Sequence, residues 1–243
     1  MTSFFAALQF LTLCPWPKRL ERSADEVGRA AIFFPVVGLA LGLILLLIDL
    51  LLDRFAGAAL SSVFLVAILV LLTRGLHLDG LGDTCDGLGA GGDRERMLSI
   101  MDDPHTGAFG LIAIVLLLFF KVHAIESMDG DRWRALLAAP VLGRWAMVLL
   151  GHRSQPAKQG LGSTLIDHLS AKHLFLATLI TVLLVAAILH AAGIAIMAWV
   201  AVFTIASKGY FHRRLGGVTG DTFGAVGELS ETSVLFFLAL GMR

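Results

Sequence analysis

Charged residues and cysteines are both scarce in this chain of 243 residues. Only 16% of its residues are charged, whereas 57% are hydrophobic, and the mean hydropathy is +0.82. This composition lies far outside the range of soluble globular domains and indicates a membrane protein, with membrane lipid and no nucleic acid as expected partners. Two cysteines, Cys14 and Cys85, are too few for a disulfide framework, so we expect both to be reduced.

The apolar segments predict an all-α, polytopic membrane helical bundle. Residues 3–13 are too few to cross a bilayer, so we expect an N-terminal interfacial or re-entrant helix there. Seven spans are expected after it, at about 31–52, 60–76, 107–125, 135–150, 174–190, 194–207 and 224–241. Residues 1–243 are expected to form a single membrane domain, and whether it assembles into a homo-oligomer stays open.

The distribution of Lys and Arg predicts the orientation of these spans. With a cytoplasmic N-terminus, thirteen of these residues face the cytoplasm and five, including Lys121, face the opposite side. This asymmetry follows the positive-inside rule for a bacterial inner membrane. It brings residues 77–106, 151–173 and 208–223 together on the cytoplasmic face.

One polar segment, HLDGLGDTCDGLGA at residues 77–90, is expected to continue the helix of the second span at the membrane surface. Asp79, Asp83 and Asp86 are spaced i, i+4 and i+7, which places them on one face of that helix. Carboxylates so arranged repel one another unless a cation lies among them, and the four glycines let a ligand or a helix approach the backbone. The alternative is a solvated helix end that pairs with nearby arginines.

A second acidic segment, GGVTGDTFGAVGELSE, covers residues 216–231. Asp221 and Glu228 are again i and i+7, on one helix face. Together the two segments would surround one or two divalent cations with oxygen ligands, and Mg²⁺ or Mn²⁺ is expected because no His and Cys cluster lies nearby. Since substrate phosphates normally complete the coordination of Mg²⁺, the expected substrate is a phosphate ester or a diphosphate.

A diphosphate also requires cations that belong to the protein. Six arginines are candidates for binding it, namely Arg94, Arg96, Arg144, Arg153, Arg213 and Arg214. The positive-inside signal explains most of them equally well, but Arg144 lies within a predicted span and is expected to be functional or paired with an acid such as Asp103. The candidates for a general base are Glu228, Asp103 and His77, in that order, although Asp103 also suits a helix cap and His77 a structural role.

These motifs resemble one known family. The run HLDGLGDTCDGLGA, followed by DRERMLSIMDD and TGAFG, and the later GGVTGDTFGA are similar to segments of the cobalamin synthase family, adenosylcobinamide-GDP ribazoletransferase. The segments FLTLCPWP and FFPVVGLALG resemble the family's opening, so the resemblance covers essentially the whole chain. It implies an integral membrane enzyme that joins adenosylcobinamide-GDP to alpha-ribazole or its 5'-phosphate, releases GMP and requires Mg²⁺. The metal ligands would be Asp79, Asp83, Asp86 and Asp221.

Two other functions stay open. The pattern Asp83-x-x-Asp86-Gly87-x-x-Ala90 resembles the first half of the CDP-alcohol phosphotransferase signature, although Gly91 stands where that signature has Arg. Acids on glycine-broken helices are also typical of the ion sites of secondary transporters. Those sites lie near the bilayer midplane, whereas the acids here are predicted at helix ends on one face.

Overall fold

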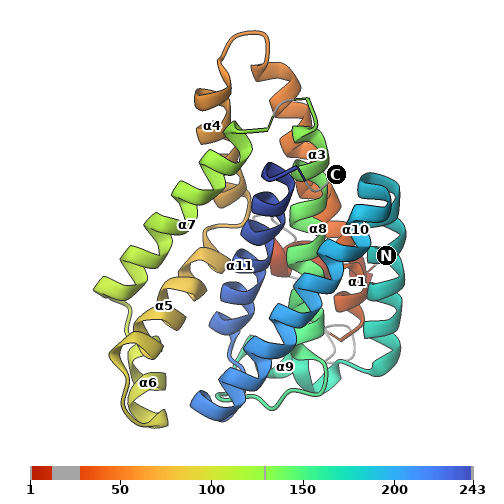
Figure 1. Ribbon diagram of the computed structural model, residues 1–243. Coiled ribbons are helices and arrows are strands. Elements are labelled where there is room, and N and C mark those ends of the chain that lie inside the picture. Colours follow the sequence, from red (N-terminus) through yellow and green to blue (C-terminus); the bar gives the residue numbers. More distant parts are fainter. Residues whose placement is uncertain (1, 13–27, 129, 242–243) are drawn as a thin grey trace.

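The computed structural model describes residues 2–12, 28–128 and 130–241, and within these ranges it contains helices and no strand (Figure 1). The all-α prediction is therefore confirmed, while Cys14 lies outside the described residues. The helices are α1 (Thr2–Leu11), the short 3₁₀ helix η1 (Ala31–Phe33), α3 (Phe34–Leu52), α4 (Ala58–Leu72), α5 (Leu76–Ala90), α6 (Arg94–Met101), α7 (Ala108–Glu126), α8 (Arg132–Gly151), α9 (Leu161–His168), α10 (Ala171–Leu215) and α11 (Gly220–Ala239).

The prediction of seven membrane spans is not confirmed. In the described part of the chain, four helical segments are long and apolar enough to cross a membrane, namely residues 28–52, α7, α8 and α10. The pair α4 and α5 adds a fifth if it counts as one broken span. The predicted span at 224–241 corresponds to α11, which is not among them because Glu228 and Glu231 lower its hydropathy.

The two spans predicted at 174–190 and 194–207 both belong to α10. Its backbone leaves the helical conformation at His190, where φ is 53° and ψ is −133°. Figure 1 shows the chain reversing its direction within α10, so that one limb rises from α9 and the other descends to the start of α11. The two ends of α10 therefore lie at the same end of the bundle.

Helix α8 lies at the centre of the bundle and packs against α3, α10 and α11. Its contact with α3 is very close, because a Cβ atom on Gly38 would lie 2.4 Å from the carbonyl oxygen of Pro140. A Cβ atom on Gly42 would lie 2.6 Å from the carbonyl oxygen of Leu136. Only glycine permits two helix backbones to approach to this distance.

The sequence had predicted that the acidic helix α5 continues α4. In the structure α5 instead turns away from α4 by 87°. The bend is made at Arg74 and Gly75, whose φ angles of 60° and 65° lie in the left-handed region. A helix of 15 residues is too short to cross a bilayer, which takes about 20 residues. By itself α5 is therefore not one of the spanning helices, and the bend directs it along α7 and α11.

The three polar segments predicted to share one face do lie at one end of the bundle, near α6 and α9 in Figure 1. The loop after α8 is tied to the segment before α11, because the N–H of Val218 donates to the carbonyl of Gln155 and the N–H of Ala157 donates to that of Val218, each at 2.9 Å. This connection holds the loop that carries Lys158 beside the start of α11.

Candidate active site

The two acidic segments meet, and glycines make the contact. A Cβ atom on Gly80 of α5 would lie 2.8 Å from the carbonyl oxygen of Asp221, and one on Gly224 of α11 would lie 2.8 Å from the carbonyl oxygen of His77. Any side chain at either position would force the helices apart. The prediction that small residues here admit a neighbouring helix is therefore confirmed.

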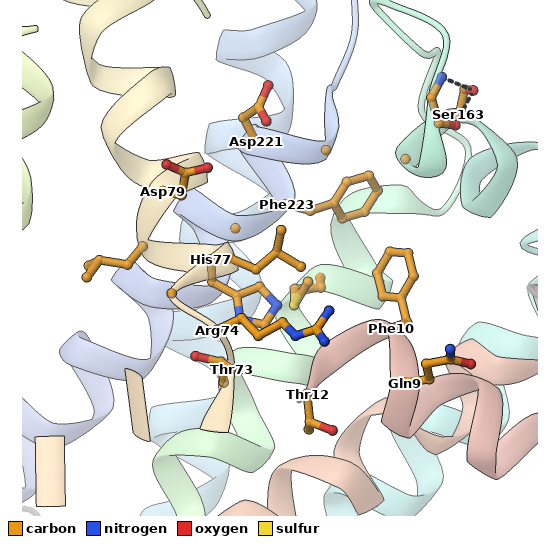
Figure 2. A pocket seen from close by; sticks show the side chains of 18 of the residues that line it. Gln9, Phe10, Thr12, Thr73, Arg74, His77, Asp79, Ser163, Asp221 and Phe223 are labelled. Atoms are coloured by element: carbon orange, nitrogen blue, oxygen red, sulfur yellow. Dashed lines mark hydrogen bonds between the residues drawn. The ribbon is translucent and has the colours of Figure 1, made fainter. Parts of the chain in front are cut away.

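A cavity of about 1070 Å³ lies beside this contact (Figure 2). Its walls come from α1, from the bend before α5, from α5, α7, α8, α9 and α11, and from the loop before α9. Its polar and aromatic lining includes Gln9, Phe10, Thr12, Thr73, Arg74, His77, Asp79, Lys158, Ser163, Asp221 and Phe223. Three residues of the predicted site are therefore brought together here, namely His77, Asp79 and Asp221.

The carboxylates near the cavity interact unfavourably with one another. Burial, together with the charges of Asp79 and Asp221, raises the pKa of Asp83 to about 6. Lys158 partly compensates this charge, since its Nζ lies 2.6 Å from Oδ1 of Asp102 and 3.0 Å from Oδ2 of Asp221. Burial alone would lower the pKa of Lys158, but its hydrogen bonds to these two carboxylates raise it above the ordinary value. A cation at this position is therefore held firmly in its charged form.

Asp86 has different partners from the other three acids. Its Oδ2 accepts a hydrogen bond from the N–H of Gly107 at 2.7 Å, and its Oδ1 accepts one from the N–H of Gly110 at 2.9 Å. These are free N–H groups in the first turn of α7, so Asp86 caps that helix from the neighbouring α5. This task accounts for its burial without a metal ion.

The side chains do not form a closed metal cluster. Among the described residues, no group of three His, Cys, Asp or Glu side chains is close enough to hold a metal ion. The donor chemistry of Asp79, Asp83 and Asp221 nevertheless suits a hard divalent cation, because all three supply carboxylate oxygens and the charge on Asp83 is left poorly compensated. Lys158 already places one positive charge against Asp221.

Glu228 belongs to an ion network buried inside the bundle. Nζ of Lys121 lies 2.6 Å from Oε2 of Glu228 and 2.6 Å from Oε1 of Glu231, and Nη1 of Arg144 lies 2.6 Å from Oε2 of Glu231. Arg144 is paired with an acid, as expected, but this acid is Glu231 and not Asp103. Lys121, which was expected to face the opposite side of the membrane, is buried instead. Glu228 does not line the cavity, so its placement does not favour the predicted role as a base.

The other two candidate bases differ sharply in their surroundings. Asp103 is exposed and accepts hydrogen bonds from the backbone N–H of His105 at 2.9 Å and from its ring at 2.8 Å, outside the cavity. His77 is 2% exposed, lines the cavity, and has no hydrogen-bond partner for either ring nitrogen in the described part of the structure. Burial, with a further contribution from Arg144, lowers the pKa of His77 to about 3, so its imidazole is neutral.

The six predicted arginines lie elsewhere, since none of them lines the cavity. Arg94 donates to the carbonyl of Ala157 at 3.1 Å, while Arg96, Arg153, Arg213 and Arg214 are exposed. The cations that do line it, Arg74 and Lys158, were not among the six candidate arginines. The sequence carried a signal for each, since Arg74 directly precedes Gly75 and the acidic helix, and Lys158 stands just before Gly160 and Gly162.

The arrangement suits the binding of an anionic ester. The N-terminal turns of α9 and α11 both border the cavity, through Gly160 and Gly162 and through Gly220 and Asp221. Helix N-termini present N–H groups and a partial positive charge to anions. With Arg74 and Lys158 they provide a positive surface, and the neutral His77 provides a hydrogen-bonding group next to it.

Comparison with known proteins agrees with this picture. A family described as cobalamin-5-phosphate synthase matches residues 3–239. The chain is 42% identical to the adenosylcobinamide-GDP ribazoletransferase of Geotalea daltonii, over 99% of this chain and 98% of the relative. It is 40% identical to the enzyme of that name from Klebsiella pneumoniae strain 342 and 36% identical to that from Escherichia coli strain K12, in each case over 98% of both chains. No solved structure is significantly similar to the chain.

Proposed function

The chain belongs to the cobalamin-5-phosphate synthase family, and from that membership we propose that it is an adenosylcobinamide-GDP ribazoletransferase. It joins adenosylcobinamide-GDP to alpha-ribazole or its 5'-phosphate and releases GMP. The observation that supports this activity best is the cavity where α5 meets α11, because it combines carboxylates, cations and a neutral histidine whose ring nitrogens have no partner among the described residues. In a displacement at a diphosphate, cations neutralise the phosphates and carboxylates can hold a metal ion that assists the reaction.

The residues of the cavity can be given separate tasks in this reaction. Arg74, Lys158 and the N-termini of α9 and α11 bind the diphosphate of adenosylcobinamide-GDP. His77 accepts a hydrogen bond from the ribose hydroxyl of alpha-ribazole and orients it. The hydroxyl oxygen attacks the phosphorus that carries the cobinamide, and the bond from this phosphorus to the bridging oxygen breaks. GMP leaves, and the hydroxyl proton goes to its departing phosphate.

Mg²⁺ belongs to this proposal as the expected cofactor. Asp79 and Asp221, which both line the cavity, would hold it together with the substrate phosphates, and when bound it would neutralise the diphosphate and stabilise the leaving oxygen. Asp86 is assigned to the start of α7 instead, on the basis of its two backbone hydrogen bonds. We assign the end of the bundle near α6 and α9 to the cytoplasmic side of a bacterial inner membrane, and the excess of basic residues there supports this assignment.

The other two functions agree less well with the comparisons. The chain's family is different from that of the CDP-alcohol phosphotransferases. The three relatives reported above are all named as transferases, which does not favour a secondary transporter.

Purified protein in lipid nanodiscs, incubated with adenosylcobinamide-GDP, alpha-ribazole and Mg²⁺, tests the proposal. We expect GMP and the joined corrinoid in equal amounts, and neither product after omission of Mg²⁺ or with Asp79→Asn in protein that elutes like the wild type. CMP release from CDP-diacylglycerol and a polyol, without GMP release from the corrinoid, would reassign the chain to the phosphotransferases. Transport of corrinoid out of loaded proteoliposomes without GMP release would reassign it to the transporters.

A further inference from the structure

One side of the cavity is aromatic and has no part in the roles assigned above. In Figure 2 the rings of Phe10 and Phe223 lie next to each other on one side, and Asp79 and Asp221 lie on the other. Phe10 comes from α1 and Phe223 from α11, so two helices far apart in the sequence supply this wall. The cavity therefore has a charged side and an aromatic side.

Both rings are held in place by neighbours outside the cavity. Phe10 stacks on the buried Phe34, with ring centroids 5.6 Å apart and an angle of 24° between the planes. Phe223 is 3% exposed, and its ring lies 3.1 Å from the position that a Cβ atom on Gly151 would occupy. Because their positions are fixed before a ligand arrives, little conformational entropy is lost when a flat ligand packs against them.

We propose, on the basis of the function proposed above, that Phe10 and Phe223 bind the benzimidazole ring of alpha-ribazole by stacking. This position leaves the ribose of the same molecule facing His77 and the charged side, where its hydroxyl is needed. It also gives α1 a part in substrate binding, whereas the sequence had predicted only an interfacial helix.

Guanine is the other planar base in the reaction, and the wall suits it less well. Its edge carries several hydrogen-bond donors and acceptors, which need polar partners around the stacked base. Ser163, a polar residue of the lining, already donates to the carbonyl of Gly160 at 2.8 Å. The dimethylbenzimidazole of alpha-ribazole has no N–H donor once the ribose is attached, so an apolar aromatic wall costs it no hydrogen bond of this kind.

Leucine substitutions remove the ring faces and keep much of the apolar volume. We expect Phe10→Leu and Phe223→Leu to weaken the binding of alpha-ribazole by roughly tenfold or more, because stacking on aromatic rings contributes substantially to base binding. The Kd is measured directly, from the benzimidazole fluorescence of alpha-ribazole, without adenosylcobinamide-GDP. Phe4→Leu is the matched control, since Phe4 is also on α1 but packs edge-on against Phe33 and does not line the cavity.

The Michaelis constants for the two substrates then show which planar base, benzimidazole or guanine, stacks on the two rings. The proposal predicts that both variants raise the KM for alpha-ribazole and leave the KM for adenosylcobinamide-GDP at its wild-type value. A rise in only the KM for adenosylcobinamide-GDP would assign the wall to guanine and overturn the proposal, as would an unchanged Kd for alpha-ribazole in both folded variants.

A second measurement needs only the wild-type protein, and so it decides the matter even if the variants do not fold. The alpha-riboside of imidazole, which has one ring in place of two, should bind at least about tenfold more weakly than alpha-ribazole, because less ring area is stacked. Equal affinities would overturn the proposal. Absence of GMP release from wild-type protein that still shows this preference would refute the proposed activity and leave the binding site standing.

Discussion

Loss of the Lys121 ammonium should destabilise the protein more than any surface change. Lys121 is 2% exposed and lies 2.6 Å from both Glu228 and Glu231, which belong to α11. In Lys121→Met the carboxylate of Glu228 stays buried without a cation, and breaking a buried pair in this way costs about 3–5 kcal/mol. For a chain of this size about 1 kcal/mol shifts Tm by roughly 2–4 °C, so a fall of roughly 6–20 °C is expected.

Thermal unfolding in detergent, followed by size-exclusion chromatography of heated samples, measures this change. Lys172→Met is the matched control because Lys172 is exposed, and it should alter Tm by no more than about 2 °C. Adding Glu228→Gln to Lys121→Met should restore part of the loss, since the buried charge is then removed. A single variant as stable as the control, or a double variant no better than the single one, would refute the reasoning.

Three further predictions concern the contact between the acidic helices and its surroundings. Gly80→Ala should lower Tm and GMP release together, because its Cβ atom would lie 2.8 Å from the carbonyl of Asp221. Gly209→Ala should behave as wild type, because its Cβ atom would meet no other part of the described structure within 4 Å, and equal Tm values for the two variants would contradict this prediction. Asp86→Ala should cost about 1–3 kcal/mol of unfolding free energy, because the N–H groups of Gly107 and Gly110 lose their acceptor, and an unchanged Tm would exclude the capping role. Lys158→Met should raise the KM for adenosylcobinamide-GDP, measured from GMP release, and Lys158→Arg should restore part of it; a KM unaffected by Lys158→Met would remove Lys158 from the diphosphate site.

The helices and the contact of the two acidic segments could be predicted because their signals are local. Long apolar runs gave the spans at 31–52, 107–125 and 135–150, which agree with α3, α7 and α8 within a few residues. The glycines and the spacing of the carboxylates on 77–90 and 216–231 indicated two helices that could approach closely. In the structure they do, at Gly80 and Gly224.

What could not be predicted depends on partners that are distant in the sequence. Lys121 was counted among the residues that face the opposite side of the membrane, because its acidic partners lie more than 100 residues further on. The short polar helices α6 and α9 lack apolar runs, and the bend at Arg74 depends on two left-handed residues. The bend brings Arg74 into the cavity, which is why the predicted set of arginines missed it.

The rate of GMP release by Asp221→Asn tests the central claim most directly. Asp221 lines the cavity, contacts α5 at Gly80 and lies 3.0 Å from Lys158. If the site between α5 and α11 carries out the displacement, this variant, folded and in nanodiscs with saturating substrates, should release GMP roughly 10²–10³ times more slowly than the wild type. GMP release at the wild-type rate would contradict the account and place the reaction elsewhere in the protein.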